Sequence, residues 1–204
     1  MHKAVRAWSI QRSFRAVSQQ STELHFMPVE QQFEGMEQQA ALASQFRDSD
    51  SSKSKGKLGL QPGDCYITKH SSLAEVHIVF HLIRDDASLL SGDVTSRHPV
   101  ILGLRNVLKQ ASSYDITCLS IPLLLVHEMS EEMTVAWCAR RAELVFKCIK
   151  GFMIETASWG GSELKTLQFI LPKGISEDLF GNLATMLPSI FRVANPLKFK
   201  ANNK

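Results

Sequence analysis

The chain has 204 residues, which corresponds to about one domain at roughly 150 residues per domain. Its contents of 44% hydrophobic and 21% charged residues are close to the globular average. A chain of this length buries roughly 70% of the surface that it exposes when unfolded. These values exclude a multidomain machine, and they exclude a small scaffold that needs disulfides or metals to fold.

The formal net charge of +3 comes mainly from the first 22 residues, which contain four basic side chains and no acid. The rest of the chain has 19 basic and 20 acidic residues, so it is close to neutral. A neutral body lacks the positive field that drives non-specific binding to nucleic acids. If the chain contacts RNA, charge alone does not explain that contact.

The four cysteines, Cys65, Cys118, Cys138 and Cys148, include no closely spaced pair of the kind that binds zinc. We expect them to be reduced and mostly buried. No apolar stretch approaches the roughly 18 to 20 residues that span a bilayer, and the N-terminus has no continuous apolar run of a secretory signal. The sequence thus predicts a cytoplasmic protein without transmembrane insertion.

Composition divides the chain into five regions. Residues 1–22 are predicted to be a basic, unstructured leader, only superficially similar to a mitochondrial transit peptide. Residues 23–46 are rich in Gln and predict a short helix after a proline. Residues 47–59 predict a disordered linker, because residues 47–57 contain no apolar side chain to bury. The folded α/β domain is expected over 60–195, followed by a polar tail over 196–204.

The first elements of this domain have clear periodicities. Residues 76–82 alternate between two faces, as in a strand with one strongly apolar face. His98 and Pro99 predict the start of a helix, because proline suits a first helical turn. The apolar residues that follow recur at three- and four-residue spacing and predict a core-facing stripe: Val100, Ile101, Leu104, Val107, Leu108 and Ala111.

The next elements repeat this alternation. Residues 116–126 are almost continuously apolar and predict a strand buried on both faces. Ser130, followed by Glu131 and Glu132, predicts the N-terminal cap of a long helix. Another strand is expected over 167–171, and Ser176 predicts the cap of a last helix. The order of elements indicates an α/β fold with a mixed or mostly parallel sheet flanked by helices.

Two histidines were considered as metal ligands. His77 and His81 are four residues apart on a predicted strand, so their side chains lie about 13 Å apart, too far to share one zinc ion. We interpret them as structural histidines on the less apolar face.

Catalytic and cofactor-binding patterns are also missing from the sequence. There is no Gly-x-Ser-x-Gly stretch, and Cys118 and Cys148 lie on predicted core faces, where an apolar setting makes a thiol inert. The loop after residue 123 has three acids and no glycine, which disfavours phosphate binding. Gly160 and Gly161 predict an ordinary turn. We predict no catalytic, cofactor-binding or metal-ligating residue, and therefore no enzyme and no cofactor.

Five strings of residues carry a resemblance to a known family: 63–71 (GDCYITKHS), 99–106 (PVILGLRN), 120–134 (SIPLLLVHEMSEEMT), 141–148 (RAELVFKC) and 186–193 (MLPSIFRV). They resemble the C-terminal part of the chromosome-twelve open-reading-frame-four protein family. The resemblance covers about Leu60 to Val193, and strings of this length are highly specific.

The resemblance implies a function. Members of that family form the third subunit of the five-subunit FERRY complex, which links an early-endosomal Rab GTPase to messenger RNA, and they are associated with mast-cell degranulation. It thus implies a non-catalytic scaffold subunit that is cytoplasmic and endosome-associated. Its partners would be the other FERRY-type subunits, with the Rab GTPase and mRNA bound indirectly. The chain has no counterpart of the family's long N-terminal half, so contacts made by that half are not expected here.

A second resemblance implies an alternative function. The order of strands and helices, with residues 116–122 as one strand, is similar to the distal half of a macro domain. That likeness implies an ADP-ribose-binding module or hydrolase. Macro domains carry a glycine-containing loop after this strand, whereas residues 123–129 contain no glycine. Fold analogy alone does not transfer function.

The predicted strand over 116–126 can be tested by one substitution. Ile121→Asp should prevent folding, because it places an unpaired charge in the core. We expect no soluble protein with a cooperative thermal transition by circular dichroism. Soluble, cooperatively melting Ile121→Asp protein would show that the strand is peripheral.

Overall fold

The structure, a computed structural model, describes residues 26–36, 60–70, 76–90, 94–158 and 164–192. A helix over residues 29–36 comes first. The elements that follow are β1 (Cys65–Lys69), β2 (Ile78–Leu82), α2 (Asp86–Leu90), α3 (Pro99–Ser113), β3 (Cys118–Pro122), α4 (Val135–Ser158), β4 (Thr166–Ile170) and α5 (Glu177–Phe191). The predicted leader, linker, polar tail and Gly160-Gly161 turn lie outside the described residues.

The strands form two small sheets. β1 and β2 pair antiparallel, with Cys65 opposite Leu82, whereas β3 and β4 pair in parallel, with Leu119 opposite Leu167. The α/β class is confirmed. The single sheet that the sequence predicts is divided, within the described ranges, because β2 and β3 do not pair with each other.

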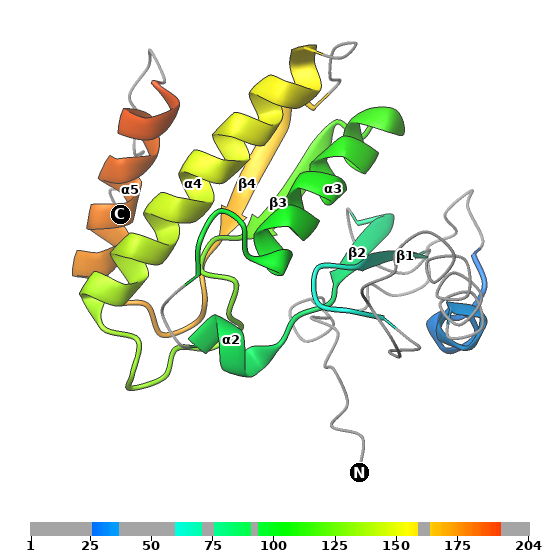
Figure 1. Ribbon diagram of the computed structural model, residues 1–204, viewed down its shortest axis with the longest axis horizontal. Helices are drawn as coiled ribbons and strands as arrows, with labels where there is room; N and C mark the ends of the chain where they lie inside the picture. Colours follow the sequence, from blue (N-terminus) through cyan, green and yellow to red (C-terminus); the bar gives the residue numbers. More distant parts are fainter. Residues whose placement is uncertain (1–25, 37–59, 71–75, 91–93, 159–163, 193–204) are drawn as a thin grey trace, which may run out of the picture.

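Three helices cover one face of the β3–β4 sheet, and α3, α4 and α5 lie side by side over it (Figure 1). Phe169 of β4 packs edge to face against Phe146 of α4, with ring centroids 4.8 Å apart. Phe191 of α5 lies 6.1 Å from the same Phe146 ring. This aromatic cluster joins the last two helices to the sheet, and burial of such side chains dominates core stability.

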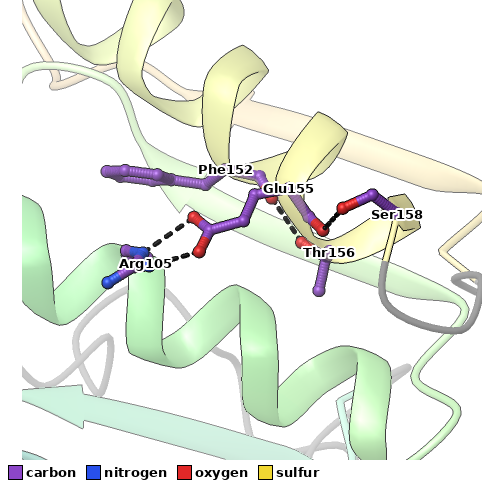
Figure 2. A network of polar contacts seen from close by, with 5 residues as sticks. All are labelled: Arg105, Phe152, Glu155, Thr156 and Ser158. Carbon is purple, nitrogen blue, oxygen red and sulfur yellow. Dashed lines mark hydrogen bonds and ion pairs between the residues drawn. The ribbon is translucent and has the colours of Figure 1, made fainter.

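Helix α3 begins where the sequence predicts. The His98 Nδ1 accepts a hydrogen bond from the Val100 amide at 3.2 Å, and Pro99 occupies the first turn. Figure 2 shows how α3 is tied to the end of α4: the Arg105 guanidinium donates two hydrogen bonds to the Glu155 carboxylate, one of them 2.8 Å long. These hydrogen bonds lower the pKa of Glu155. The pair is exposed, so it fixes orientation more than it adds stability.

Helix α3 also approaches the β1–β2 hairpin closely. An added Cβ at Gly103 would lie 2.3 Å from Leu82 Cδ1 and 2.7 Å from the Gly63 carbonyl oxygen. Gly63 itself has a φ of 92°, in the region that favours glycine. The two glycines therefore allow the backbone of α3 to come into close contact with the backbone of the turn before β1.

The opposite face of this hairpin is covered by the helix over residues 29–36. The Gln32 side chain exchanges two hydrogen bonds with the backbone of Lys69, at 2.8 and 2.9 Å. Phe33 packs edge to face against Tyr66, 6.1 Å away. The hairpin is thus held between two helices.

Two sequence predictions about α4 and β3 are wrong. Helix α4 is not capped by Ser130. Its cap is Thr134, whose hydroxyl accepts a hydrogen bond from the Trp137 amide at 3.2 Å. Glu131 and Glu132, which follow Ser130, lie in an exposed turn. Strand β3 is not buried on both faces, because Leu119 and Ile121 are buried while Cys118 is exposed. The described helices α3, α4 and α5 lie over one side of it (Figure 1), so its burial alternates along the strand.

Other predictions about the elements are confirmed, and two elements were missed. Ser176 caps α5 by accepting the Leu179 amide at 3.3 Å. The predicted strands over 76–82 and 167–171 correspond to β2 and β4. Strand β1 and helix α2 had not been predicted, because each is only five residues long and lacks a sustained periodicity.

The contact between α3 and the hairpin can be tested with matched glycine variants. Gly103→Ala should destabilise the fold by roughly 1–3 kcal/mol, because the new methyl group overlaps a backbone carbonyl. Gly151→Ala in α4 meets nothing within 4 Å and should stabilise by roughly 0.5–1 kcal/mol through helix propensity. Urea denaturation measures both changes. A Gly103→Ala variant as stable as Gly151→Ala would contradict the close approach.

Candidate functional site

A cavity lies between β2 and β3, which do not pair with each other within the described ranges. Its volume is about 660 Å³, within the range of sites that enclose ligands. Both strands, the start of the loop after β3 and one face of α3 line it. We call this cavity the trough; its principal lining residues are Ile78, Phe80, Leu82, Val100, Leu104, Val107, Cys118, Ser120, Pro122 and Leu125.

One long wall of the trough is the edge of β2 that faces away from β1, which pairs with no other strand among the described residues. In the antiparallel pair with β1, the His70 amide donates to the His77 carbonyl and the Ile83 amide donates to the Asp64 carbonyl. Hydrogen-bonded positions alternate along such a strand, so residues 77, 79, 81 and 83 point their backbone groups at β1. The N–H and C=O groups of Ile78, Phe80 and Leu82 point the other way, towards β3.

The other long wall is the edge of β3 that faces away from β4, for which the described part of the chain supplies no partner strand. The Thr166 amide donates to the Thr117 carbonyl, and the Leu123 amide donates to the Ile170 carbonyl. In a parallel pair with this register, the backbone N–H and C=O groups of residues 117, 119, 121 and 123 hydrogen-bond to β4. The backbone groups of Cys118 and Ser120, and the carbonyl of Pro122, therefore point into the trough. Proline is tolerated in a strand where its missing N–H faces a free edge.

The floor and one end of the trough are fixed. Val100, Leu104 and Val107 of α3 form an apolar floor. At the C-terminal ends of both strands, the Arg84 guanidinium donates to the Leu125 carbonyl at 2.9 Å. Leu125 has a φ of 59°, a strained conformation for a leucine. The Arg84 contact thus holds the loop after β3 in an unusual position at the end of the trough.

Arg84 is also paired with Asp86, at 2.9 Å. Partial burial lowers the pKa of Arg84, and the nearby Asp86 opposes this effect. Sequence reasoning had not singled out this residue. A lone arginine after a strand carries no signal, because its role depends on the distant Leu125 carbonyl.

Two of the histidines lie on the far face of the hairpin. His81 and Thr68 are almost fully buried, and their side chains form a hydrogen bond of 2.7 Å; Thr68 forms another with His70, at 2.8 Å. Burial, with a smaller effect of His70, lowers the pKa of His81 to about 4. The His81 ring stacks on Tyr66 at 4.6 Å. His81 is therefore a structural histidine in a buried polar cluster. The face of β2 that carries Val79 and His81 is the more buried one, whereas Ile78 on the more apolar face is exposed, which the sequence pattern does not predict.

His77 is exposed at the margin of the trough, away from this cluster. Across the described ranges, no group of three or more His, Cys, Asp or Glu side chains is arranged to hold a metal ion.

The cysteines differ from one another. Burial raises the pKa of the Cys65 thiol to about 12, with a further contribution from Asp64. Burial also raises the pKa values of Cys138 and Cys148. Cys118 is exposed on the rim of the trough, so the prediction that it is a buried, inert thiol is wrong. Its side chain points to the uncovered face of β3.

A buried arginine forms a second polar site, which the sequence reasoning had missed. Arg141 of α4 is 4% exposed; it donates to the Leu89 carbonyl at 2.6 Å and stacks on Trp137 at 4.5 Å. Burial lowers its pKa to about 10. Its position among apolar residues of a helix face was the available signal. The contacts that it makes join α4 to α2.

The buried histidine generates a prediction about pH. Because the unfolded chain binds a proton near pH 6.5 that the native state does not bind until about pH 4, stability should fall as pH is lowered through this window. The contribution reaches up to about 1.4 kcal/mol per pH unit. His81→Phe should remove this part of the slope in urea denaturation at pH 7, 5.5 and 4.5. An equal slope in both proteins would contradict the assignment.

Comparisons with known proteins extend the family likeness along the chain. Residues 3–197 match the family model described as Ferry endosomal RAB5 effector complex subunit 3. The chain is 50% identical over 206 aligned positions to the mouse protein named FERRY endosomal RAB5 effector complex subunit 3, and 48% identical to the human protein of that name.

Each of these alignments covers 92% of the chain, which spans only 37% of the length of either relative. Within the described ranges, no helix is long and apolar enough to cross a membrane. The extent of the match decides the family: the chain belongs to the family of Ferry endosomal RAB5 effector complex subunit 3.

Proposed function

We propose that the protein is a non-catalytic scaffold subunit of a cytoplasmic, early-endosomal Rab5 effector complex of the FERRY type. The observation that carries this proposal is the 50% identity to the mouse subunit across 92% of the chain. At this identity the fold is shared with the mouse subunit, so contacts that its matching part makes are expected of this chain as well.

The chemistry of the described residues supports a scaffold role. The thiols of Cys65, Cys138 and Cys148 have raised pKa values, which suits packing better than nucleophilic attack. The loop after β3 is acidic and contains no glycine. Its Glu128 forms a parallel backbone bridge with Lys173, so this loop pairs with the segment between β4 and α5.

The role in messenger RNA transport is expected to be indirect. The chain outside its first 22 residues has a net charge near zero, and RNA affinity rises with the number of phosphates that basic side chains neutralise. RNA would then be bound by partner subunits, with this chain as a connecting piece between them and the Rab GTPase. An influence on mast-cell degranulation would follow from the same endosomal complex.

Affinity purification from cells tests the proposal. The tagged chain should recover the other FERRY-type subunits and the endosomal Rab5 GTPase, whereas tagged Ile121→Asp, which cannot fold its core, should recover none. Purified chain should bind RNA weakly in filter assays at physiological salt, and RNA recovery from cells should fall when partner subunits are depleted.

The alternative, a macro-type module that binds or hydrolyses ADP-ribose conjugates, gives opposite results. Recovery of no partner subunits, together with a rise in melting temperature on addition of ADP-ribose, would contradict the scaffold proposal and favour that alternative. Release of free ADP-ribose from a modified protein by the purified chain would do the same.

A further inference from the structure

We propose that the trough between β2 and β3 binds one extended peptide strand. In the longer relatives this strand comes from the part of their length that lies outside the match with this chain. The inserted strand would pair with β2 on one side and β3 on the other, which completes a five-stranded sheet. This inference goes beyond the scaffold role and does not depend on it.

The backbone groups that line the trough identify an extended peptide as the occupant. Ile78, Phe80 and Leu82 present N–H and C=O groups from one wall, and Cys118 and Ser120 present theirs from the other. Among the described residues none of these groups has a strand partner. A strand carries N–H and C=O groups along both of its edges, with a repeat of two residues. The two rows of backbone groups in the trough have the same repeat, so a bound peptide could hydrogen-bond to both, as peptides do when they add to an exposed sheet edge.

The side chains specify the pattern of the occupant. Val100, Leu104 and Val107 form an apolar floor on the helical side of the trough. Successive side chains of a strand point to opposite faces, so alternate residues of the inserted strand must be apolar to contact this floor. The remaining residues would lie on the face of Ser120 and Gln168, whose side chains hydrogen-bond at 2.9 Å, and can be polar.

The topology favours a strand at this place. β2, α3 and β3 form a strand, helix, strand unit, and the C-terminal ends of both strands meet at the contact between Arg84 and Leu125. In such units the helix packs over the sheet that the two strands share. Here α3 lies over the gap between them, and its Leu104 and Val107 line the trough. A strand in the gap would restore the continuous sheet.

The source of the strand follows from length and symmetry. The relatives are much longer than the part that this chain matches, so they have ample additional chain to supply it. A second copy of this chain fits poorly, because a two-fold contact brings identical edges together. The trough instead has the edge of β2 on one side and the edge of β3 on the other.

The experiment uses the full 204-residue chain and overlapping synthetic peptides from the part of the mouse relative that it does not match. At least one peptide with alternating apolar residues should bind, raise the melting temperature and slow maleimide labelling of the exposed Cys118. Amide hydrogen exchange by NMR should slow at Ile78, Phe80, Leu82, Cys118 and Ser120. Without peptide, these amides should exchange faster than Val79, His81, Leu119 and Ile121.

A pair of variants at one position separates the trough from other binding surfaces. Ser120→Pro removes an N–H that faces the trough and leaves every β3–β4 ladder bond intact, so it should weaken peptide binding about tenfold. Ser120→Ala keeps the N–H and removes only the hydroxyl, so affinity should stay within about twofold. Circular dichroism melts establish that both variants fold.

Several results would overturn the inference. One is failure of every peptide to bind, and another is binding that Ser120→Pro leaves unchanged. Slow exchange of the trough amides without peptide would place the occupant in this chain, and protection that grows with chain concentration would place it in a second copy. Binding only by peptides from another FERRY-type subunit would assign the trough to a partner.

Discussion

Helix α3 contacts the turn before β1 at a point where no side chain comes between the two backbones. Gly103 on the helix and Gly63 in the turn permit this approach, since a Cβ at either position would overlap backbone atoms. The same helix is tied to α4 through Arg105 and Glu155 on its other side. Because α3 touches both sheets, its position sets the separation of β2 and β3 and therefore the width of the trough. Any residue with a Cβ at Gly103 would move α3 away from the turn and so change the separation of β2 and β3.

Two buried polar clusters lie outside the lining of the trough. Thr68, His70 and His81 share hydrogen bonds beneath the helix over residues 29–36, and Arg141 donates to the backbone near α2 while stacking on Trp137. Burying such groups is costly unless hydrogen bonds satisfy them. Each cluster joins elements that are distant in sequence, although His81 Nδ1 and Arg141 Nη1 are buried and make no hydrogen bond among the described residues. The pKa values of His81 and Arg141 are lowered by that burial, which is the expected sign for bases removed from water.

The parts of the fold that could be predicted are those with local signals. Pro99 after His98, the apolar stripe of α3 and the cap at Ser176 each depend on residues a few positions apart. The existence of β2 was predicted in the same way, but its more buried face, with Val79 and His81, is set by the distant residues that pack on it. The position of the α4 cap was mistaken because Ser130 and Thr134 are both good cap residues, and only packing selects Thr134. The trough could not be predicted, since it depends on which strands fail to pair. Pro122 was its one local sign, because proline disfavours a central position in a sheet.

The two free edges also bear on how this chain behaves in concentrated solution. Strand edges with unpaired backbone groups are templates for pairing with other chains, and natural proteins protect them with charge, proline or cover. β3 has proline at one end, whereas β2 has an apolar edge with Ile78 exposed and no charged residue between Ile78 and Leu82. The protection of this edge comes from the recess formed by α3 and the neighbouring strand. If α3 moved away, the backbone groups at the outer edge of β2 would become accessible to other chains. Aggregation on heating should therefore begin with local opening of this helix rather than with global unfolding.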